Sequence, residues 1–440
     1  MTGRTKYGFS AAISIVVANM IGTGVFTSLG FQLLGINSAF AILLLWALGG
    51  VAAFCGAVAY AELGAALKRS GGEYQFLARA FHPGAGFISG WISVSIGFAA
   101  PTALAAMTFA AYLTAAAAPD AGYFAKSGIA IALIVALAAI HGARRRASGA
   151  MQTVFTAIKV LVILAFCSAA FFFNAEPQPV DFRPMLSDGD VIASADFAVA
   201  LIYVSFAYTG WNAAAYLTGE IESPERNLPL VLGAGAIIVT ALYVALNASF
   251  LIAAPIEKLA GEIEVGFIAA VAMFGETAGA WTAAVMACLL ISTVSAMTIA
   301  GPRVLGAIGE DYALFKPIAK RNVDGIPTRA IFVQSALAIL FIITGSFESI
   351  LVLAGSLVAL NSFAAVVGLY VLRMREPDLP RPYKAFGYPV TPALYLMVTG
   401  WALAYTLSSR PMEAVFVIAV IAAGGALYLI ANKQSTRGSP

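Results

Sequence analysis

The sequence predicts an all-α polytopic membrane protein with twelve transmembrane helices. Of its 440 residues, 61% are hydrophobic and only 11% are charged, and the mean hydropathy is +0.89. A soluble protein carries about 25% charged residues, so this chain lies far outside that class. Apolar runs long enough to cross a bilayer, about 20 residues at a rise of 1.5 Å each, recur along the whole chain.

The predicted spans follow one another without a soluble domain between them. They lie near residues 8–34, 40–66, 86–115, 127–142, 149–173, 195–219, 229–254, 279–308, 330–345, 349–374, 388–408 and 412–431. The run at 330–345 is short for a span. No linker rich in Pro, Gly or Ser divides the chain, so we expect residues 1–440 to form a single membrane domain.

The lysines and arginines predict the orientation of the chain in the bilayer. Of the 25 residues of these two types, Lys159 lies inside a span and four lie on one side, namely Lys126, Arg183, Lys258 and Arg410, which leaves 20 on the other side. The positive-inside rule assigns the side rich in lysine and arginine to the cytoplasm. We therefore expect the N- and C-termini to be cytoplasmic.

Two of the predicted spans are interrupted by residues that leave helical geometry easily. The first span contains ANMIGTGVF at 18–26, and the sixth contains FAYTGWN at 206–212. Glycines in a membrane helix can also serve close helix packing. Asn19 before Gly-Thr-Gly favours an unwound segment instead, which is tolerated at membrane depth only where it lines a cavity or is buried in protein.

The positions of the two breaks predict an internal repeat. The broken helices are the first and the sixth, so each begins a set of five, at residues 8–173 and 195–374, and residues 388–431 supply two additional helices. An odd number of helices per set forces the two sets into opposite orientations. Transporters built from inverted repeats carry discontinuous helices at corresponding positions, and these breaks form the substrate site. The sequence therefore predicts a transport domain.

Several stretches resemble the amino acid–polyamine–organocation superfamily. ANMIGTGVF is similar to its first-helix motif, YAELG with SGGEY (60–64 and 70–74) to its second helix and the following loop, and AGPR (300–303) to the end of its eighth helix. FAYTGWN with EIESPERNLP (220–229) resembles the L-type amino acid transporter branch. The resemblance, which is to permeases of the bacterial type, implies a LeuT-like 5+5 inverted-repeat fold and Na⁺-independent transport of amino acids by alternating access.

The resemblance also implies where the substrate binds. Backbone N–H groups of Thr23, Gly24 and Val25 would bind the substrate carboxylate, because the N-terminus of a half-helix favours negative charge. Carbonyl groups at the ends of the preceding half-helices would bind the substrate ammonium. The residues that would supply these carbonyls are Met20, Phe206, Ala207 and Thr209.

Three side chains of the sixth helix are predicted to shape the pocket. By resemblance, Phe206 is expected to close over the substrate as a gate, with ordinary packing in the helix bundle as the alternative. Thr209 stands where the family commonly has Gly, and its extra volume favours small substrates. Asn212 could hydrogen-bond either the substrate or its own helix, and the sequence does not distinguish the two.

Lys159 is the most informative charge in the sequence. It lies about ten residues into the fifth span, roughly 15 Å along the helix axis, and snorkelling to the interface is the alternative to a functional role. By resemblance it occupies the place where sodium-driven relatives hold Na⁺, and bonds carbonyls of the first helix and a hydroxyl of the eighth, Ser292 or Thr293. A fixed cation there would make Na⁺ coupling unnecessary.

Two carboxylates have a simpler explanation. Glu62 and Glu73 fall toward the cytoplasmic face, where we expect contacts with Lys68, Arg69 or Arg79. A role in proton coupling is the alternative for both glutamates.

The predicted function is Na⁺-independent transport of small neutral L-amino acids, with exchange as the expected mode. A proton-coupled symporter of amino acids or polyamines is the first alternative, although polyamines call for acidic residues in the cavity and none is evident. A membrane receptor or enzyme is the second, and the sequence lacks HExxH, paired catalytic carboxylates in a span and a phosphate loop. We therefore expect no enzyme activity and no cofactor. Cys55, Cys167 and Cys288 all lie in apolar runs, so we also expect no metal site and no disulfide.

The expected partners are the amino acid substrate and the lipid bilayer. The net charge of +3 follows from the topology and gives no reason to expect nucleic-acid binding. Animal relatives of the L-type branch join a heavy chain through a cysteine between the third and fourth helices. This chain has no cysteine between Ala116 and Ser127, so we expect no covalent heavy-chain subunit and a bacterial inner-membrane protein.

Overall fold

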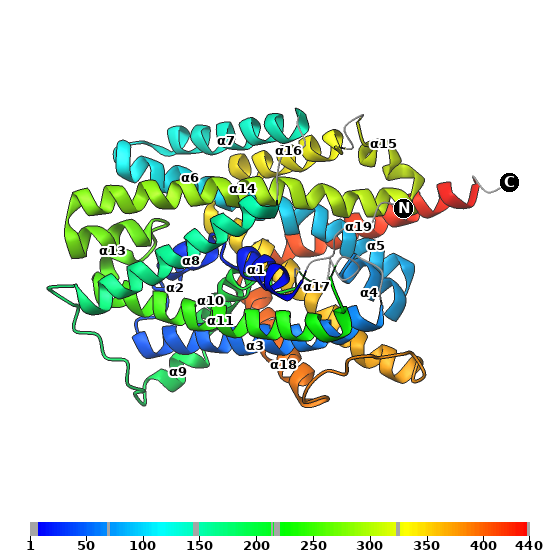
Figure 1. Ribbon diagram of the computed structural model, residues 1–440, viewed down its shortest axis with the longest axis horizontal. Coiled ribbons are helices and arrows are strands. Elements are labelled where there is room, and N and C mark those ends of the chain that lie inside the picture. The colour runs from blue at the N-terminus through cyan, green and yellow to red at the C-terminus, as the bar shows by residue number, and fades with distance from the viewer. Residues whose placement is uncertain are drawn as a thin grey trace.

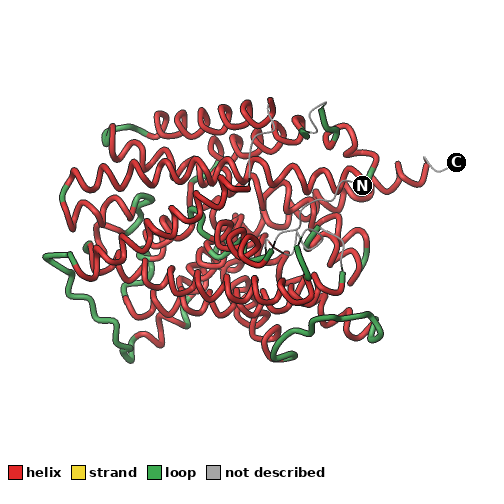
Figure 2. Tube along the Cα trace, viewed as in Figure 1, coloured by secondary structure: helices red, strands yellow, loops and turns green. Residues whose placement is uncertain are grey.

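The computed structural model describes residues 8–67, 71–143, 149–212, 214, 221–322 and 326–437, and its elements within these ranges are all helices. Figure 1 shows most of them running along the long axis of the molecule, and Figure 2 shows the loops between them, of which those at 173–187 and 376–389 are long. This arrangement agrees with the predicted all-α polytopic class.

The described residues of the first half form nine α-helices and one π-helical segment. Their bounds are α1 Phe9–Met20, α2 Gly24–Gln32, α3 Ala39–Ala66, α4 Glu73–Ala80, α5 Pro83–Ile92, η1 Ser93–Phe98, α6 Ala99–Ala117, α7 Tyr123–Ala143, α8 Gly149–Phe172 and α9 Asp188–Ile192.

In the described part of the second half, ten α-helices follow, together with the 3₁₀ turn η3. Their bounds are α10 Ala195–Ala207, α11 Pro224–Ala253, α12 Ile256–Leu259, α13 Val265–Phe274, α14 Glu276–Asp311, η3 Ala313–Phe315, α15 Lys316–Ala319, α16 Thr328–Thr344, α17 Phe347–Arg375, α18 Val390–Ser409 and α19 Pro411–Arg437.

Ten of the twelve predicted spans coincide with helical stretches that are long and apolar enough to cross a membrane. The other two coincide with α10 and α16, which are apolar but shorter than 18 residues. Residues 213 and 215–219 of the predicted sixth span lie outside the described residues. A multi-pass membrane protein follows from these helices, whereas the count of twelve spans stays a prediction.

Several shorter helices lie between the predicted spans, and the apolar helix α13 is the one that reaches the first break. The segment between the seventh and eighth predicted spans contains α12 and the apolar helix α13, where we expected only a loop. α13 packs against α14 and also contacts α2, so its apolar face is covered by protein. Its ten residues are too few to span a bilayer, which is why a search for long runs passes over it.

Small residues let the central helices approach closely. α3 packs along α11, and a Cβ added at Gly50 of α3 would lie 2.2 Å from the side chain of Thr240 on α11. A Cβ at the neighbouring Gly49 would lie 2.2 Å from Val204 of α10. A larger side chain at either position would push these helices apart, so the two glycines fix α3 against both α10 and α11.

The two helix breaks lie in the largest buried apolar cluster of the molecule. Met20, Ile21 and Val25 on the first break and Phe206 and Ala207 on the second are all buried in this cluster. Non-helical backbone at membrane depth is tolerated when protein surrounds it. The breaks therefore meet the physical condition for existing inside a bilayer.

Candidate functional site

The first break separates α1 from α2 by three residues. α1 ends at Met20, and the N–H of Gly22 donates back to the Met20 carbonyl at 2.7 Å. α2 begins at Gly24, with Thr23 as its N-cap. The N–H groups of Gly24 and Val25 lie in the first turn of α2, where a helix offers no backbone acceptor. They are therefore donors of the kind that binds an anion at a helix N-terminus.

Glycine at position 24 is required for contact between the two broken helices. A Cβ on Gly24 would lie 2.5 Å from the Cα of Ala207 on α10, closer than real contacts allow. The resemblance implies that the N–H group of Gly24 binds the substrate carboxylate. In the structure the missing side chain would meet α10, while the N–H group of Gly24 stays available at the start of α2.

The second break follows α10 at Ala207 and passes through a turn to Asn212. Gly210 has φ +101° within this turn, and a Cβ there would lie 2.6 Å from the backbone of Asn19 on α1. Both its backbone conformation and this contact exclude a larger residue. The two breaks are therefore packed directly against each other.

Thr209 engages the backbone of its own turn. Both its backbone N–H and its hydroxyl donate to the Phe206 carbonyl, at 3.0 Å and 2.6 Å. A carbonyl oxygen has two lone pairs, so these two bonds occupy the acceptor capacity of Phe206. The Phe206 carbonyl, one of the groups predicted for the substrate ammonium, is thus already satisfied in this structure.

Tyr243 is a site residue that sequence reasoning missed. It is fully buried on α11, and its hydroxyl lies 2.5 Å from the Met20 carbonyl oxygen and 3.1 Å from that of Ala207. The hydroxyl therefore sits at the carbonyl ends of both α1 and α10. A buried Tyr hydroxyl needs a partner, which is the available signal, but the chain has 16 Tyr and nothing in the sequence selects this one.

Lys159 joins three segments. Its side chain on α8 is 4% exposed, and the ammonium donates to the Ile21 carbonyl in the first break at 3.1 Å and to the Thr293 hydroxyl on α14 at 2.9 Å. Ser292, the other candidate partner, donates to the Leu289 carbonyl of its own helix at 2.7 Å. The charge of Lys159 is thus held at the break and not at the membrane surface.

Phe206 lies on the buried face of α10, 4% exposed, and packs near α17. A Cβ on Gly355 of α17 would lie 3.5 Å from the Cβ of Phe206 and 2.7 Å from Ile202, so Gly355 permits this close contact. Nearer the start of α10, Tyr203 contacts Phe31 of α2 edge-on, and Phe31 stacks on Phe347 at 5.3 Å. These ring contacts join α2, α10 and α17.

Asn212 bonds neither its own helix nor any group of the first break in the described contacts. Its amide donates to Glu73 Oε1 of α4 at 2.7 Å, and the Tyr60 hydroxyl donates to the same oxygen at 2.8 Å. Glu73 is 2% exposed, so this is a buried polar cluster. The second break is therefore connected to α4, a connection that the sequence did not suggest.

Glu62 pairs with arginines that were not expected, and the expectation that Arg79 contacts it was wrong. Glu62 is 1% exposed, and it pairs with Arg373 of α17 at 2.5 Å and Arg381 at 3.3 Å, while the N–H of Ala385 donates to it at 2.6 Å. Arg79 pairs instead with Glu376 at 2.8 Å. Lys68 and Arg69, the other expected partners, lie outside the described residues. The short sequence distance to these cations was misleading, because Glu62 finds its partners more than 300 residues later.

Two further contacts tie α2 to the segment that contains α13. The Tyr112 hydroxyl of α6 lies 3.2 Å from the Phe26 carbonyl of α2 and accepts from the N–H of Gly266 on α13 at 3.1 Å. The N–H of Gly261 donates to the Gly30 carbonyl of α2 at 2.8 Å. Tyr112 is fully buried, so the hydrogen bonds of its hydroxyl are shielded from water.

Metal-ligating side chains do not gather anywhere in the described ranges. No group of three or more His, Cys, Asp or Glu side chains within them could hold a metal ion. The chemistry that the breaks offer is instead that of backbone donors, backbone acceptors and one fixed ammonium group.

Comparison with known proteins identifies one family, and the relatives found are amino acid transporters. A family described as amino acid permease matches residues 7–437. The b(0,+)-type amino acid transporter 1 of Mus musculus is 27% identical over 97% of this chain and 87% of its own length. The large neutral amino acids transporter small subunit 2 of Homo sapiens is 28% identical over 97% of this chain and 80% of its own length. These relatives are transporters and not enzymes.

Proposed function

We propose that this chain, which belongs to the amino acid permease family, exchanges small neutral L-amino acids by alternating access without Na⁺. Family membership supports amino acid transport. The observation that carries Na⁺-independence is the Lys159 ammonium, which donates to the Ile21 carbonyl and the Thr293 hydroxyl. A cation is therefore already present between the first break and α14, and no ion from solution is needed to bind these two oxygens.

The two breaks offer complementary groups for a zwitterion. A zwitterion must have both charges paired before it enters a medium of low dielectric constant. We assign its carboxylate to the N–H groups of Thr23, Gly24 and Val25 and to the Thr23 hydroxyl. We assign its ammonium to the Ala207 carbonyl, which shares the Tyr243 hydroxyl with the Met20 carbonyl and retains acceptor capacity. The Met20 carbonyl lies beside it but also accepts from the N–H of Gly22, so it would have to exchange one of these two donors for the substrate.

The sixth helix supports a preference for small substrates. Thr209 is part-buried beside the second break, and its hydroxyl is held against the Phe206 carbonyl, so its methyl group has a fixed position. That methyl group reduces the space available to a substrate side chain next to the break. Phe206 and Asn212 would complete the pocket, with Phe206 as the gate and Asn212 held in place by Glu73.

The same proposal includes the topology. Residues 8–173 and 195–374 would form the two inverted sets of five helices, with residues 388–431 as two additional helices and both termini in the cytoplasm of a bacterial cell. One relative is named as a small subunit, which implies a second chain for that protein. This chain has no cysteine between Ala116 and Ser127, which supports a transporter without a covalent heavy chain.

One observation favours a second candidate, proton-coupled symport. Glu73 is a buried carboxylate bonded to Asn212 of the second break, so its protonation would alter that contact. Proton coupling predicts that uptake rises with an inwardly directed pH gradient, whereas exchange predicts dependence on internal substrate. The two candidates are thus distinguished by a single transport assay.

The test is uptake of radiolabelled amino acids into proteoliposomes that contain the purified chain alone. We expect alanine- and serine-sized substrates to enter only when the vesicles contain unlabelled amino acid, and choline to replace Na⁺ without loss of rate. A pH gradient should change the initial rate by less than twofold. Empty liposomes provide the control for leakage.

Three outcomes would contradict parts of this proposal. A requirement for Na⁺ would overturn the role assigned to Lys159. Equal uptake with and without internal substrate would overturn exchange, and strong stimulation by a pH gradient would favour the symporter. Transport of large aromatic amino acids at the same efficiency as small ones would overturn the role assigned to Thr209.

A further inference from the structure

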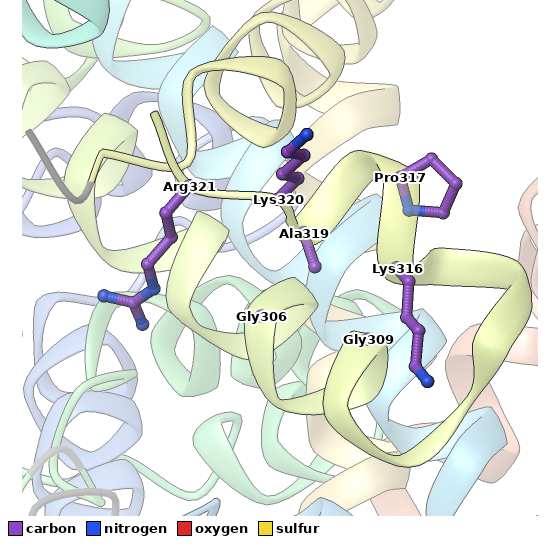
Figure 3. A pocket seen from close by; sticks show the side chains of 7 residues that line it. All are labelled: Gly306, Gly309, Lys316, Pro317, Ala319, Lys320 and Arg321. Carbon is purple, nitrogen blue, oxygen red and sulfur yellow. The ribbon is translucent and has the colours of Figure 1, made fainter. Parts of the chain in front are cut away.

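A basic pocket lies at the end of α14, away from the helix breaks. The cavity has a volume of about 510 Å³. Its lining residues are Gly306, Gly309, Lys316, Pro317, Ala319, Lys320 and Arg321, and Figure 3 shows them on α14 and on the segment from α15 to Arg321. The charged members of this lining are all cations, and their side chains are exposed.

Two glycines of α14 build the pocket in different ways. A Cβ on Gly309 would lie 2.3 Å from the Cβ of Ala319, so glycine is what lets α15 lie directly on α14. A Cβ on Gly306 would meet no atom within 4 Å, so its face of α14 borders open space. α15 is also held by α16, because Arg329 of α16 donates to the Pro317 carbonyl of α15 at 3.0 Å.

The depth of the pocket matches that of lipid headgroups. The apolar stretch of α14 runs for 31 residues, from Glu276 to Gly306, which at 1.5 Å per residue is about 46 Å. A bilayer with its headgroups is about 40–45 Å thick, so Gly306 lies where the hydrocarbon core has ended. In Figure 1, α15 and α16 lie at the upper edge of the bundle, with α16 beside α7, so this end of α14 is near the periphery of the molecule.

We propose that this pocket binds the phosphodiester headgroup of an anionic phospholipid in the cytoplasmic leaflet. Arg321 and Lys316 lie on opposite sides of the two glycines in Figure 3, so an anion over the glycine face would have positive charge on both sides. Arg is suited to phosphate because its planar guanidinium can donate two parallel hydrogen bonds. Soluble phosphates share this chemistry, but the depth and the edge position favour a lipid, and basic pockets on the cytoplasmic side are known sites for such headgroups.

The test uses the full-length purified chain in phosphatidylcholine nanodiscs that contain increasing fractions of phosphatidylglycerol. Native mass spectrometry counts the phosphatidylglycerol molecules retained, and a thermal-shift assay measures the accompanying stabilisation. Parallel samples receive glycerol phosphate or inorganic phosphate in place of the anionic lipid. Removing one positive charge next to an anionic membrane lowers affinity by about fivefold, so Lys320→Gln and Arg321→Gln should each weaken retention by about that factor.

Two variants separate the pocket from general surface charge. Gly306→Leu fills the open space while leaving every charge in place, and it should abolish specific retention of phosphatidylglycerol. Lys384→Gln removes an exposed cation elsewhere on the side of the chain predicted to be cytoplasmic, and it should leave retention unchanged. The charge variants change exposed side chains only, so they should fold, and size-exclusion chromatography checks this.

The proposal is overturned if Lys384→Gln weakens retention as much as Arg321→Gln, because binding would then reflect diffuse charge. It is also overturned if a folded Gly306→Leu protein retains phosphatidylglycerol like the wild type. If glycerol phosphate or inorganic phosphate stabilises the protein as much as the lipid does, the pocket is a site for soluble anions instead. The proposal is supported if Gly306→Leu loses the specific retention of phosphatidylglycerol and the charge variants at Lys320 and Arg321 show reduced retention.

Discussion

At the scale of single residues, Lys159 and Tyr243 serve the same backbone from two sides. Lys159 donates to the Ile21 carbonyl, and the Tyr243 hydroxyl lies 2.5 Å from the Met20 carbonyl one residue earlier. Both carbonyls lost their helical partners where α1 ends. The Met20 carbonyl still accepts from the N–H of Gly22, so the Ile21 carbonyl depends more on its side-chain partner, and a buried carbonyl without a partner costs about 1–3 kcal/mol. These two side chains therefore stabilise a break that the backbone alone could not maintain in an apolar surrounding.

Replacing Lys159 with Ala should leave the Ile21 carbonyl and the Thr293 hydroxyl without their charged partner. The loss of these bonds raises the free energy of the conformation that contains them relative to the other conformations of the transport cycle. The interconversion between them should therefore slow, and uptake should drop at least tenfold. Substrate binding in detergent should fall less, because the groups proposed to hold the substrate belong to other residues. Uptake and equilibrium binding are measured on the same preparation.

The neighbouring hydroxyls of α14 provide matched controls for this prediction. Thr293→Val removes the bond to Lys159 and should lower uptake, whereas Ser292→Ala removes only a bond within α14 and should have little effect. Normal uptake by Lys159→Ala would mean that the ammonium has no role in transport. Equal effects of the Thr293 and Ser292 variants would mean that any change in this part of α14 lowers uptake and that the hydrogen bond from Lys159 to Thr293 is not the cause.

Among single residues, the sequence singled out the ammonium group of Lys159, but it did not reveal which side chains bond the backbone carbonyls of the breaks. Lys159 stood out because an ammonium deep in an apolar run is rare and needs an explanation. Tyr243 did not stand out, because its role depends on two carbonyls that belong to other helices and become neighbours only after folding. The donors already bound to the Phe206 carbonyl were hidden for the same reason, since a Thr209 hydroxyl can bond many local acceptors.

At the scale of helices, the contact between α2 and α10 depends on Gly24. The Cβ of Gly24→Ala would lie 2.5 Å from Ala207, so even this variant must separate the two helices, and Gly24→Leu must do so by more. We expect Gly24→Ala to lower uptake several-fold and Gly24→Leu to abolish it, with a lower melting temperature in both. Uptake and fluorescence-detected size exclusion measure the two effects.

Gly22→Ala is the control from the same break. A Cβ there meets its nearest neighbour at 3.8 Å, an ordinary contact, so this variant should transport at close to the wild-type rate. If Gly24→Ala is as active as Gly22→Ala, the close approach of α2 to α10 does not limit transport. If both are inactive, the flexibility of the break matters more than the contact.

The connection between α2 and α13 makes a second prediction at this scale. Tyr112→Phe removes the hydroxyl that accepts from the N–H of Gly266 and lies beside the Phe26 carbonyl, so two buried backbone groups lose their partner. At about 1–3 kcal/mol for a buried unpaired group, local opening should increase roughly tenfold or more. Hydrogen–deuterium exchange across residues 261–274 should become faster by a similar factor.

Tyr123→Phe tests whether this effect is local. Its hydroxyl donates to the Ile342 carbonyl between α7 and α16, so its removal should not alter exchange in residues 261–274. Unchanged exchange in Tyr112→Phe would show that the Gly261 to Gly30 bond alone holds this segment on α2.

The helices themselves were largely predictable, and the exceptions have a physical cause. A bilayer demands runs of about 20 apolar residues, so ten of the predicted runs correspond to helices of that length. α13 was missed because it has only ten residues and is covered by protein, which imposes no such length. The breaks were visible as Gly-containing interruptions, but the contact between them, through Gly24 and Gly210, required the folded arrangement.

At the scale of the whole molecule, Glu62 connects the second predicted span with the end of α17. Its carboxylate receives Arg373, Arg381 and the N–H of Ala385, so the connection between α17 and α18 is held on α3. No local sequence pattern predicts the pair of Glu62 and Arg373, because the two residues are 311 positions apart in the sequence. Long-range ion pairs of this kind are fixed by topology, and the nearer cations were a poor guide to them.

Glu62→Gln should therefore destabilise the protein strongly, because it removes the one negative charge that two arginines share. Breaking a buried ion pair by changing one partner costs about 3–5 kcal/mol, whereas an exposed pair contributes about 0–1 kcal/mol. Glu376→Gln is the matched control, since its pair with Arg79 has side chains that are 29% and 56% exposed. Thermal unfolding in detergent should show a melting temperature several degrees lower for Glu62→Gln and nearly unchanged for Glu376→Gln. Equal melting temperatures for the two variants would mean that the α17–α18 connection stays on α3 without its central charge.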